Sequence, residues 1–131
     1  MGWKNIVLWV LQWFFGIYFI AIGVMHFSVP DGLPAMMEWM YQLDDTMHVV
    51  AGIAEILGGI GLILPSITRI QPQLTVIAAA GLVLVMIGAV VFHANRGEGA
   101  SIATNVIIGA LMAFVAYGRW KIAPIQPRQE R

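Results

Sequence analysis

Residues 48–65 read HVVAGIAEILGGIGLILP, an apolar run that carries one carboxylate, Glu55, in its interior. A carboxylate within hydrocarbon costs roughly 2.5 kcal/mol or more on insertion scales, so Glu55 must face protein, water or a partner. The small residues around it let neighbouring helix backbones approach closely. On an α-helix one stripe collects His48, Ala51, Glu55, Gly58 or Gly59, and Leu62. We predict that this stripe is the inward face of a membrane helix.

The rest of the chain has the composition of a small membrane protein. Of its 131 residues, 60% are hydrophobic and 11% are charged, and the mean hydropathy is +0.82. An ordinary soluble domain carries about 25% charged residues. The net charge of zero offers no basic surface to nucleic acid. Because cysteine is absent, disulfides, thiolate nucleophiles and cysteine-ligated clusters are excluded within these residues.

Four apolar stretches are long enough to cross about 30 Å of hydrocarbon. The first exceeds the apolar core of a cleaved signal peptide, about 7–15 residues, and is interpreted as a permanent helix. Pro65 is expected to end the second helix, and Ser101 to cap the fourth. The predicted fold is one all-α integral-membrane domain, residues 1–131, built as an antiparallel four-transmembrane-helix bundle. Its helices are expected at about residues 6–27, 47–64, 74–93 and 101–117, with a flexible tail at residues 118–131.

The connection at residues 28–46 is the longest. Its first part is rich in proline and glycine, which favour a turn. Apolar residues then recur at roughly helical spacing: Leu33, Met36, Met37, Met40 and Leu43. Trp39 and Tyr41 lie among them. This pattern predicts a short helix in the membrane interface, within the first outer loop.

The positively charged residues are distributed unevenly among the connections. If both termini are cytoplasmic, the opposite side of the membrane carries only Arg96. The cytoplasmic side then carries Lys4, Arg69, Arg119, Lys121, Arg128 and Arg131. This positive-inside bias predicts cytoplasmic termini in a multi-pass protein of the cell membrane.

Under this topology, most hydrogen-bonding side chains of the spans lie in the outer half of the bundle. The candidate polar or ligand site comprises His26, His48, Glu55, His93 and Asn105. Each also has a purely structural explanation: histidines at helix ends form interfacial hydrogen bonds, a protonated Glu55 can donate to a carbonyl, and Asn105 can join two helices. The inner half offers only Gln12. Gly16, Gly23, Gly81 and Gly88 are interpreted as packing contacts.

These residues leave three kinds of chemistry open. Histidines with a carboxylate can relay protons from the outer surface. They can exchange protons with the oxygens of a quinone headgroup, or they can bind zinc or iron. No two histidines share a local motif such as HxxxH, so a metal site would depend wholly on the fold, and we assign no metal ligand.

Three sequence motifs resemble those of the DoxX and DoxX-like membrane proteins. They are GVMHF at residues 23–27, AEILGGIGLILP at residues 54–65 and AAGLVLVMIGAVVFH at residues 79–93. The resemblance spans about residues 6–118 and implies a four-helix membrane bundle. The family takes its name from the membrane subunit of a thiosulfate:quinone oxidoreductase, and other relatives are associated with redox homeostasis or with assembly of membrane partners. By position, His26, Glu55 and His93 match the family's recurring polar residues.

Three functional hypotheses follow. The first is a membrane subunit of a quinone-linked redox system, in which case any enzyme would be an oxidoreductase and quinone the candidate cofactor. The alternative is a non-enzymatic scaffold or assembly partner that docks another membrane protein or a second copy of the chain. The third, transport of a proton or small solute, needs a continuous polar path, and the inner half offers only Gln12 to build one.

Overall fold

The structure is a computed structural model that describes residues 2–130, and these residues contain helices but no strand. The elements are α1 (Trp3–Met25), the 3₁₀-helix η1 (Ala35–Gln42), α2 (Asp45–Thr68), α3 (Gln73–Asn95), α4 (Gly99–Tyr117) and the π-helix η2 (Gly118–Ile122). Four of the helical segments are long and apolar enough to cross a membrane. The predicted all-α fold with four membrane-length helices is therefore confirmed.

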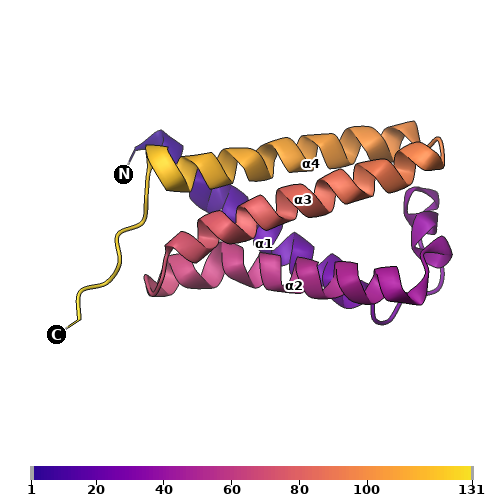
Figure 1. Ribbon diagram of the computed structural model, residues 1–131, viewed down its shortest axis with the longest axis horizontal. Coiled ribbons are helices and arrows are strands. Elements are labelled where there is room, and N and C mark those ends of the chain that lie inside the picture. Colours follow the sequence, from indigo (N-terminus) through magenta and orange to yellow (C-terminus); the bar gives the residue numbers. More distant parts are fainter. Residues whose placement is uncertain (1, 131) are drawn as a thin grey trace.

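Successive long helices run in opposite directions (Figure 1). α1 packs against α2, α2 against α3 and α3 against α4, whereas α1 and α4 make far fewer contacts. Both chain ends and the α2–α3 connection lie at one end of the bundle, called here the termini end (Figure 1). The η1 segment and the α3–α4 turn lie at the other end, called here the η1 end (Figure 1).

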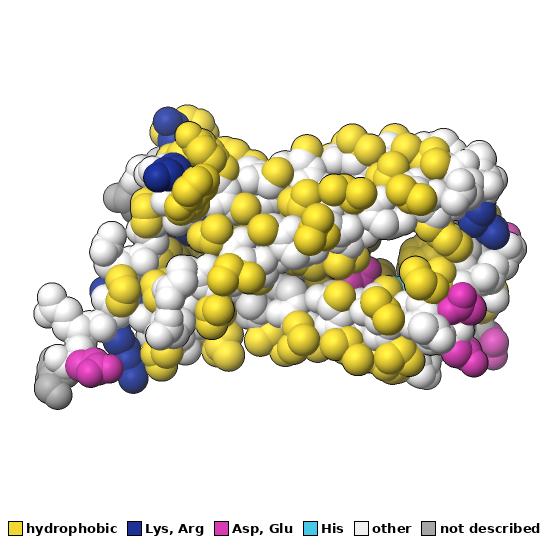
Figure 2. Space-filling view, viewed as in Figure 1, with side chains coloured by type: hydrophobic (Ala, Val, Ile, Leu, Met, Phe, Trp, Pro, Cys, Tyr) yellow, Lys and Arg dark blue, Asp and Glu magenta, His cyan; other side chains and the backbone are white. Residues whose placement is uncertain are grey.

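Large apolar side chains cover the outside of the helices (Figure 2). Phe14 of α1, Ile77 and Leu84 of α3 are examples of exposed apolar residues. A soluble monomer rarely exposes apolar patches larger than a few hundred Å². These side chains therefore contact the lipid of the bilayer, and the protein is a multi-pass membrane protein.

Two pairs of glycines bring α1 and α2 into backbone contact. A Cβ atom built on Gly23 would lie 2.9 Å from the carbonyl oxygen of Gly52, and one on Gly52 would lie 3.0 Å from the carbonyl oxygen of Gly23. Seven residues later in α2 and seven residues earlier in α1, a Cβ on Gly59 would lie 2.6 Å from the carbonyl oxygen of Gly16. The packing role predicted for Gly16 and Gly23 is thus confirmed. Small residues at both crossing points let the two helices approach more closely than larger side chains would allow.

The same prediction for the glycines of α3 is wrong. A Cβ on Gly81 or on Gly88 would meet no atom within 4 Å, so neither glycine is needed for close helix packing. Gly88 instead lines a cavity that is described below.

Pro65 does not end α2, contrary to the prediction, and the helix continues to Thr68. Proline lacks the N–H that would donate to the carbonyl of residue 61. The hydroxyl of Thr75 on α3 donates to the carbonyl oxygen of Gly61 at 3.1 Å, so this acceptor is satisfied from a neighbouring helix. α2 ends at Arg69, whose φ of 59° is left-handed, as is common at helix C-termini.

Two predictions about α4 are also corrected. Helix α4 begins at Gly99, with Glu98 at the N-cap position, so Ser101 lies inside the helix and does not cap it. At the other end, the chain does not become a tail at residue 118, because η2 extends the helical conformation to Ile122. This extension was not predicted from the sequence, because charged residues such as Arg119 and Lys121 are typical of a solvated terminus.

The glycine contacts generate a test with a matched control. We expect Gly59→Ala to destabilise the protein by roughly 1–3 kcal/mol, because the added methyl group overpacks the backbone of α1. Gly81→Ala makes the same chemical change where the space is open, and it should leave stability unchanged or raise it slightly. Thermal unfolding in detergent measures both variants, and equal melting temperatures would contradict the proposed role of the glycine contacts.

Candidate functional site

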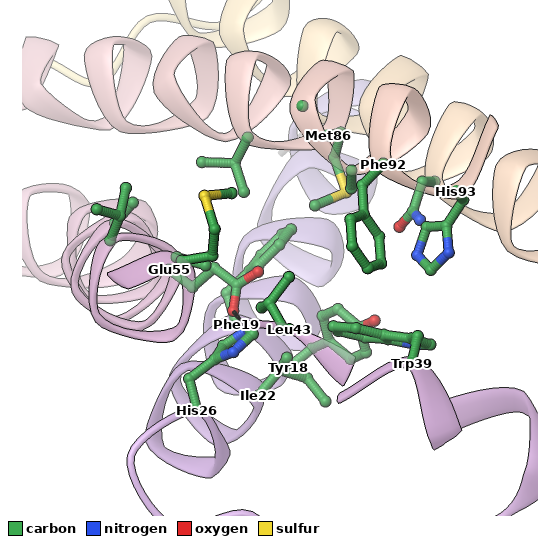
Figure 3. A pocket seen from close by; sticks show the side chains of 18 residues that line it. Tyr18, Phe19, Ile22, His26, Trp39, Leu43, Glu55, Met86, Phe92 and His93 are labelled. Carbon is green, nitrogen blue, oxygen red and sulfur yellow. Dashed lines mark ion pairs between the residues drawn. The ribbon is translucent and has the colours of Figure 1, made fainter. Parts of the chain in front are cut away.

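Glu55 is buried in the middle of α2, where it faces the end of α1. Its side chain lies close to His26, with 3.2 Å between Glu55 Oε2 and His26 Nε2. The two residues lie on opposite sides of the contact between Gly23 and Gly52, and the close approach of α1 and α2 there lets their side chains reach each other. Figure 3 shows the two side chains pointing toward one another. The predicted inward face of α2 is confirmed at Glu55, which is 6% exposed.

His48 extends this contact toward the η1 end. Its Nδ1 atom lies 2.8 Å from Nδ1 of His26, and its Nε2 atom lies 2.9 Å from the carbonyl oxygen of Met40 in η1. The side chains of His26, His48, Met40 and Glu55 are all buried. The structure therefore contains a continuous chain of close polar contacts from the Met40 carbonyl through two imidazole rings to a carboxyl group.

His93 does not join this chain. Trp39 of η1 lies between the rings, with its centroid 6.0 Å from that of His26 and 5.4 Å from that of His93. The His93 Nδ1 atom lies 3.2 Å from Oε1 of Glu98. Of the predicted histidines, His26 lies beside Glu55 and His48 contacts His26, whereas His93 lies across the cavity on α3 (Figure 3).

Glu98 is also bound by Arg96, whose Nε donates to Oε1 at 2.5 Å. This hydrogen bond is the main reason that the pKa of Glu98 lies below its ordinary value, and His93 lowers it further. Glu98 consequently remains a carboxylate at neutral pH, and His93 carries its proton on Nδ1 to donate to it. The contact stabilises the fold at neutral pH, and that contribution is lost as the pH falls through the lowered pKa.

A cavity of about 230 Å³ separates His93 from the His26–Glu55 pair. Four of the five predicted site residues line it, namely His26, Glu55, His93 and Asn105, whereas His48 does not. The remaining lining is mostly apolar and comes from α1, η1, α2 and α3. Figure 2 shows the cavity as a hollow between α2 and α3, with an acidic side chain visible inside it. The hollow opens on the apolar, lipid-facing side of the bundle.

Two atoms at the wall of this cavity lack hydrogen-bond partners among residues 2–130. They are Nε2 of His26 and Oε2 of Glu55, both fully buried. Their separation of 3.2 Å is within ion-pair distance, but the two groups are not directed at each other as a hydrogen bond requires. An unpartnered buried polar atom costs about 1–3 kcal/mol, and more when charged. The site therefore retains unused capacity to bind a polar group.

A second polar cluster lies in the termini half of the bundle, where the sequence indicated only Gln12. The Gln12 amide donates to the carbonyl oxygen of Leu62 at 2.7 Å and to the Ser66 hydroxyl at 2.9 Å. Ser66 in turn lies 2.8 Å from the hydroxyl of Thr75. The network thus joins α1, α2 and α3, and the interpretation of the inner half as nearly devoid of polar groups is wrong.

Arg119 of η2 completes this cluster. It is 4% exposed, and its Nε donates to Oε1 of Gln12 at 2.6 Å while its Nη1 donates to Oδ1 of Asn5 at 2.6 Å. Its guanidinium also lies over the ring of Trp9, 5.1 Å from the centroid. Arg119 was not predicted as part of a buried cluster, because it was interpreted as a solvated cation of the flexible tail. The apolar residues on both sides of it were the available signal.

Within the part of the chain that the structure describes, no three histidine, aspartate or glutamate side chains are grouped to hold a metal ion.

Comparison with known proteins finds one family. A family model described as the DoxX-like family matches residues 10–115. No curated protein and no solved structure gives a significant match.

The polar cluster of the termini half, which joins Gln12, Ser66, Thr75 and Arg119, generates a test of stability. We expect Gln12→Leu to destabilise the protein by about 2–3 kcal/mol, because it leaves Nε of the buried Arg119 guanidinium without an acceptor while Nη1 keeps Asn5 and the carbonyl oxygen of Ala123. In the double variant Gln12→Leu/Arg119→Met both partners are apolar, so stability should return toward that of the wild type. Unfolding in detergent of the wild type, both single variants and the double variant gives the coupling energy. Purely additive losses would show that the contact does not stabilise the fold.

Proposed function

The chain belongs to the DoxX-like family, and from this premise we propose that it is a membrane subunit of a quinone-linked redox system, with a quinone headgroup held in the cavity beside Glu55. The observation that carries the proposal is the pair of buried, unpartnered atoms, His26 Nε2 and Glu55 Oε2, at the wall of a cavity that opens toward lipid.

The size of the cavity supports a headgroup rather than a complete ligand. At about 230 Å³ it is smaller than the roughly 300–1,000 Å³ of pockets that enclose drug-sized molecules. Its opening is bordered by apolar side chains of α2 and α3, such as Val50 and Val85. A ligand with one polar ring and a long apolar tail fits this arrangement, because the tail can remain in the bilayer.

The lining residues supply complementary roles for such a ring. His26 and Glu55 present a proton-exchanging pair at one wall, and Asn105 of α4 also lines the cavity and can donate a hydrogen bond. The indole of Trp39 offers an aromatic face. When bound, a quinone supplies reversible two-electron, two-proton chemistry. The part of this chain is to orient the ring, exclude water and hold a proton at His26 Nε2 or Glu55 Oε2.

We also propose that the single membrane domain is oriented with its termini end in the cytoplasm of a cell membrane. At the termini end lie Lys4, Arg69, Arg119, Lys121 and Arg128, whereas Arg96 lies at the η1 end. Arg131, the remaining predicted cytoplasmic cation, lies outside the described residues. The positive-inside rule then places η1 and the cavity toward the outer surface, with η1 near the interface.

Transport receives less support than quinone binding. In each of three helices a fully buried apolar residue stands between the two polar clusters: Phe19 in α1, Leu62 in α2 and Leu82 in α3. A polar solute would have to cross this apolar layer. The scaffold alternative makes a different prediction, since substitutions of Glu55 would then act only through stability.

Quinone binding tests the proposal directly. Decylubiquinone and menadione, added to the purified protein in nanodiscs, are expected to quench tryptophan fluorescence saturably, and Trp39→Phe should remove most of the quenching because the other tryptophans lie outside the cavity. Glu55→Gln should weaken binding about tenfold, the equivalent of about 1.4 kcal/mol.

Glu38→Gln is the matched control for this measurement. It makes the same chemical change at an exposed position of η1, and it should leave the affinity unchanged. The proposal fails if neither quinone binds saturably, or if Glu55→Gln binds as the wild type does. The latter result, combined with a constant crosslinked membrane partner, would favour the scaffold function.

A further inference from the structure

His26 forms a wall between two cavities. On one side lies the lipid-facing cavity described above, and on the other lies a second cavity of about 460 Å³ near η1. His48 lines only the second cavity, together with Asp45 and Tyr41 of the η1 end. The contact between the two imidazole rings therefore runs from one cavity toward the other.

The protonation of both rings can be derived from one acceptor. The carbonyl oxygen of Met40 can only accept a hydrogen bond, so the Nε2 atom of His48, 2.9 Å away, carries a proton. In a neutral His48 the Nδ1 atom is then bare and must accept. Nδ1 of His26, at 2.8 Å, is consequently the donor.

The contact between His26 and Glu55 holds one more proton. With its proton on Nδ1, a neutral His26 presents a bare Nε2 to Oε2 of Glu55 at 3.2 Å. A carboxylate and a bare imidazole nitrogen this close together in a buried site are unfavourable, so one proton resides on this pair, either on the carboxyl group or on an imidazolium. From Nδ1 of His26 onward, both donors then point from the lipid-facing cavity toward η1.

We propose that His26 and His48 form a proton wire that connects the quinone cavity with the aqueous surface at the η1 end; the inference rests on the proposed function. A proton that arrives at His26 Nε2 makes the ring cationic, and the Nδ1 proton of His26 passes to Nδ1 of His48. His48 then releases its Nε2 proton to water in the second cavity. One proton enters and one leaves, and the rings must reorient before the next transfer.

The groups that surround the wire are few. Tyr18 of α1 and His93 of α3 line the first cavity beside Glu55, and Asp45 and Tyr41 line the second beside His48. Asp45 is the only one of these four residues whose side chain carries a carboxyl group. It lies at the end of the wire where the structure places proton release, and it stabilises a cationic His48 there.

Nuclear magnetic resonance of histidine-¹⁵N-labelled protein in nanodiscs tests the wire without any turnover. We expect a scalar coupling across the hydrogen bond between His26 Nδ1 and His48 Nδ1, with His48 protonated at Nε2. Exchange with water should be faster at His48 Nε2 than at His26 Nδ1. Absence of the coupling, or faster exchange at His26, would overturn the inference.

His48→Gln separates proton transfer from a merely structural role. The glutamine amide can donate to Met40 and its oxygen can accept from His26, but the side chain cannot take up a proton. We expect decylubiquinone affinity within about twofold of the wild type and exchange of the His26 Nδ1 proton slowed at least about tenfold. His93→Gln, outside the wire, should leave the exchange rate of the His26 Nδ1 proton unchanged.

The outcomes distinguish the two proposals. A coupling between the rings without quinone binding would preserve the wire and refute the quinone function. Quinone binding without the coupling would refute the wire and preserve the function. Unchanged His26 exchange in His48→Gln would also refute the wire, because His48 would then not be the route to water.

Discussion

The backbone contact between α1 and α2 at Gly23 and Gly52 is the constraint on which the candidate site depends. At this crossing a Cβ on either glycine would lie within about 3 Å of the opposite carbonyl oxygen, so larger side chains would separate the helices. Because the helices are antiparallel, His26 lies beyond its glycine toward the η1 end and Glu55 beyond its glycine toward the termini end, and the two side chains reach across the close crossing to 3.2 Å. A wider crossing would leave the carboxyl group facing the lipid-side cavity without the imidazole beside it.

Both polar clusters of the bundle contain a buried atom without a hydrogen-bond partner, Nη2 of Arg119 in one and Nε2 of His26 and Oε2 of Glu55 in the other, but only the second cluster borders a cavity. In the cluster of the termini half, Gln12 uses both its amide nitrogen and its oxygen, and its contacts connect several helices. Such connected networks rigidify a core and are costly to disrupt. In the cluster of the η1 half, His26 and Glu55 retain unpartnered atoms beside a cavity. The first arrangement is that of a structural clamp, and the second is that of a site with capacity for a ligand.

The sequence predicted what depends on local pattern and missed what depends on contacts between distant segments. Hydrophobic length gave the four membrane helices, and a carboxylate among small residues identified the inward face at Glu55. The family resemblance is confirmed by the match over residues 10–115. The continuation of α2 past Pro65 depends on a hydroxyl of α3, and the burial of Arg119 depends on acceptors more than 100 positions away in α1. No local pattern contains that information, and the same is true of Trp39, which separates His93 from the other histidines.

The arrangement of the two clusters also limits where the site beside Glu55 can exchange protons. Toward the termini end, the fully buried side chains of Phe19 and Leu62 close the path below Glu55, and Gln12 and Arg119 are occupied by each other beyond them. Toward the η1 end, the polar contacts continue without interruption to the backbone of Met40. Protons follow polar contacts, whereas an apolar ligand follows the apolar opening to lipid. If both proposals hold, protons and the apolar ligand reach the cavity by separate routes, and both routes lie in the half of the bundle that carries η1.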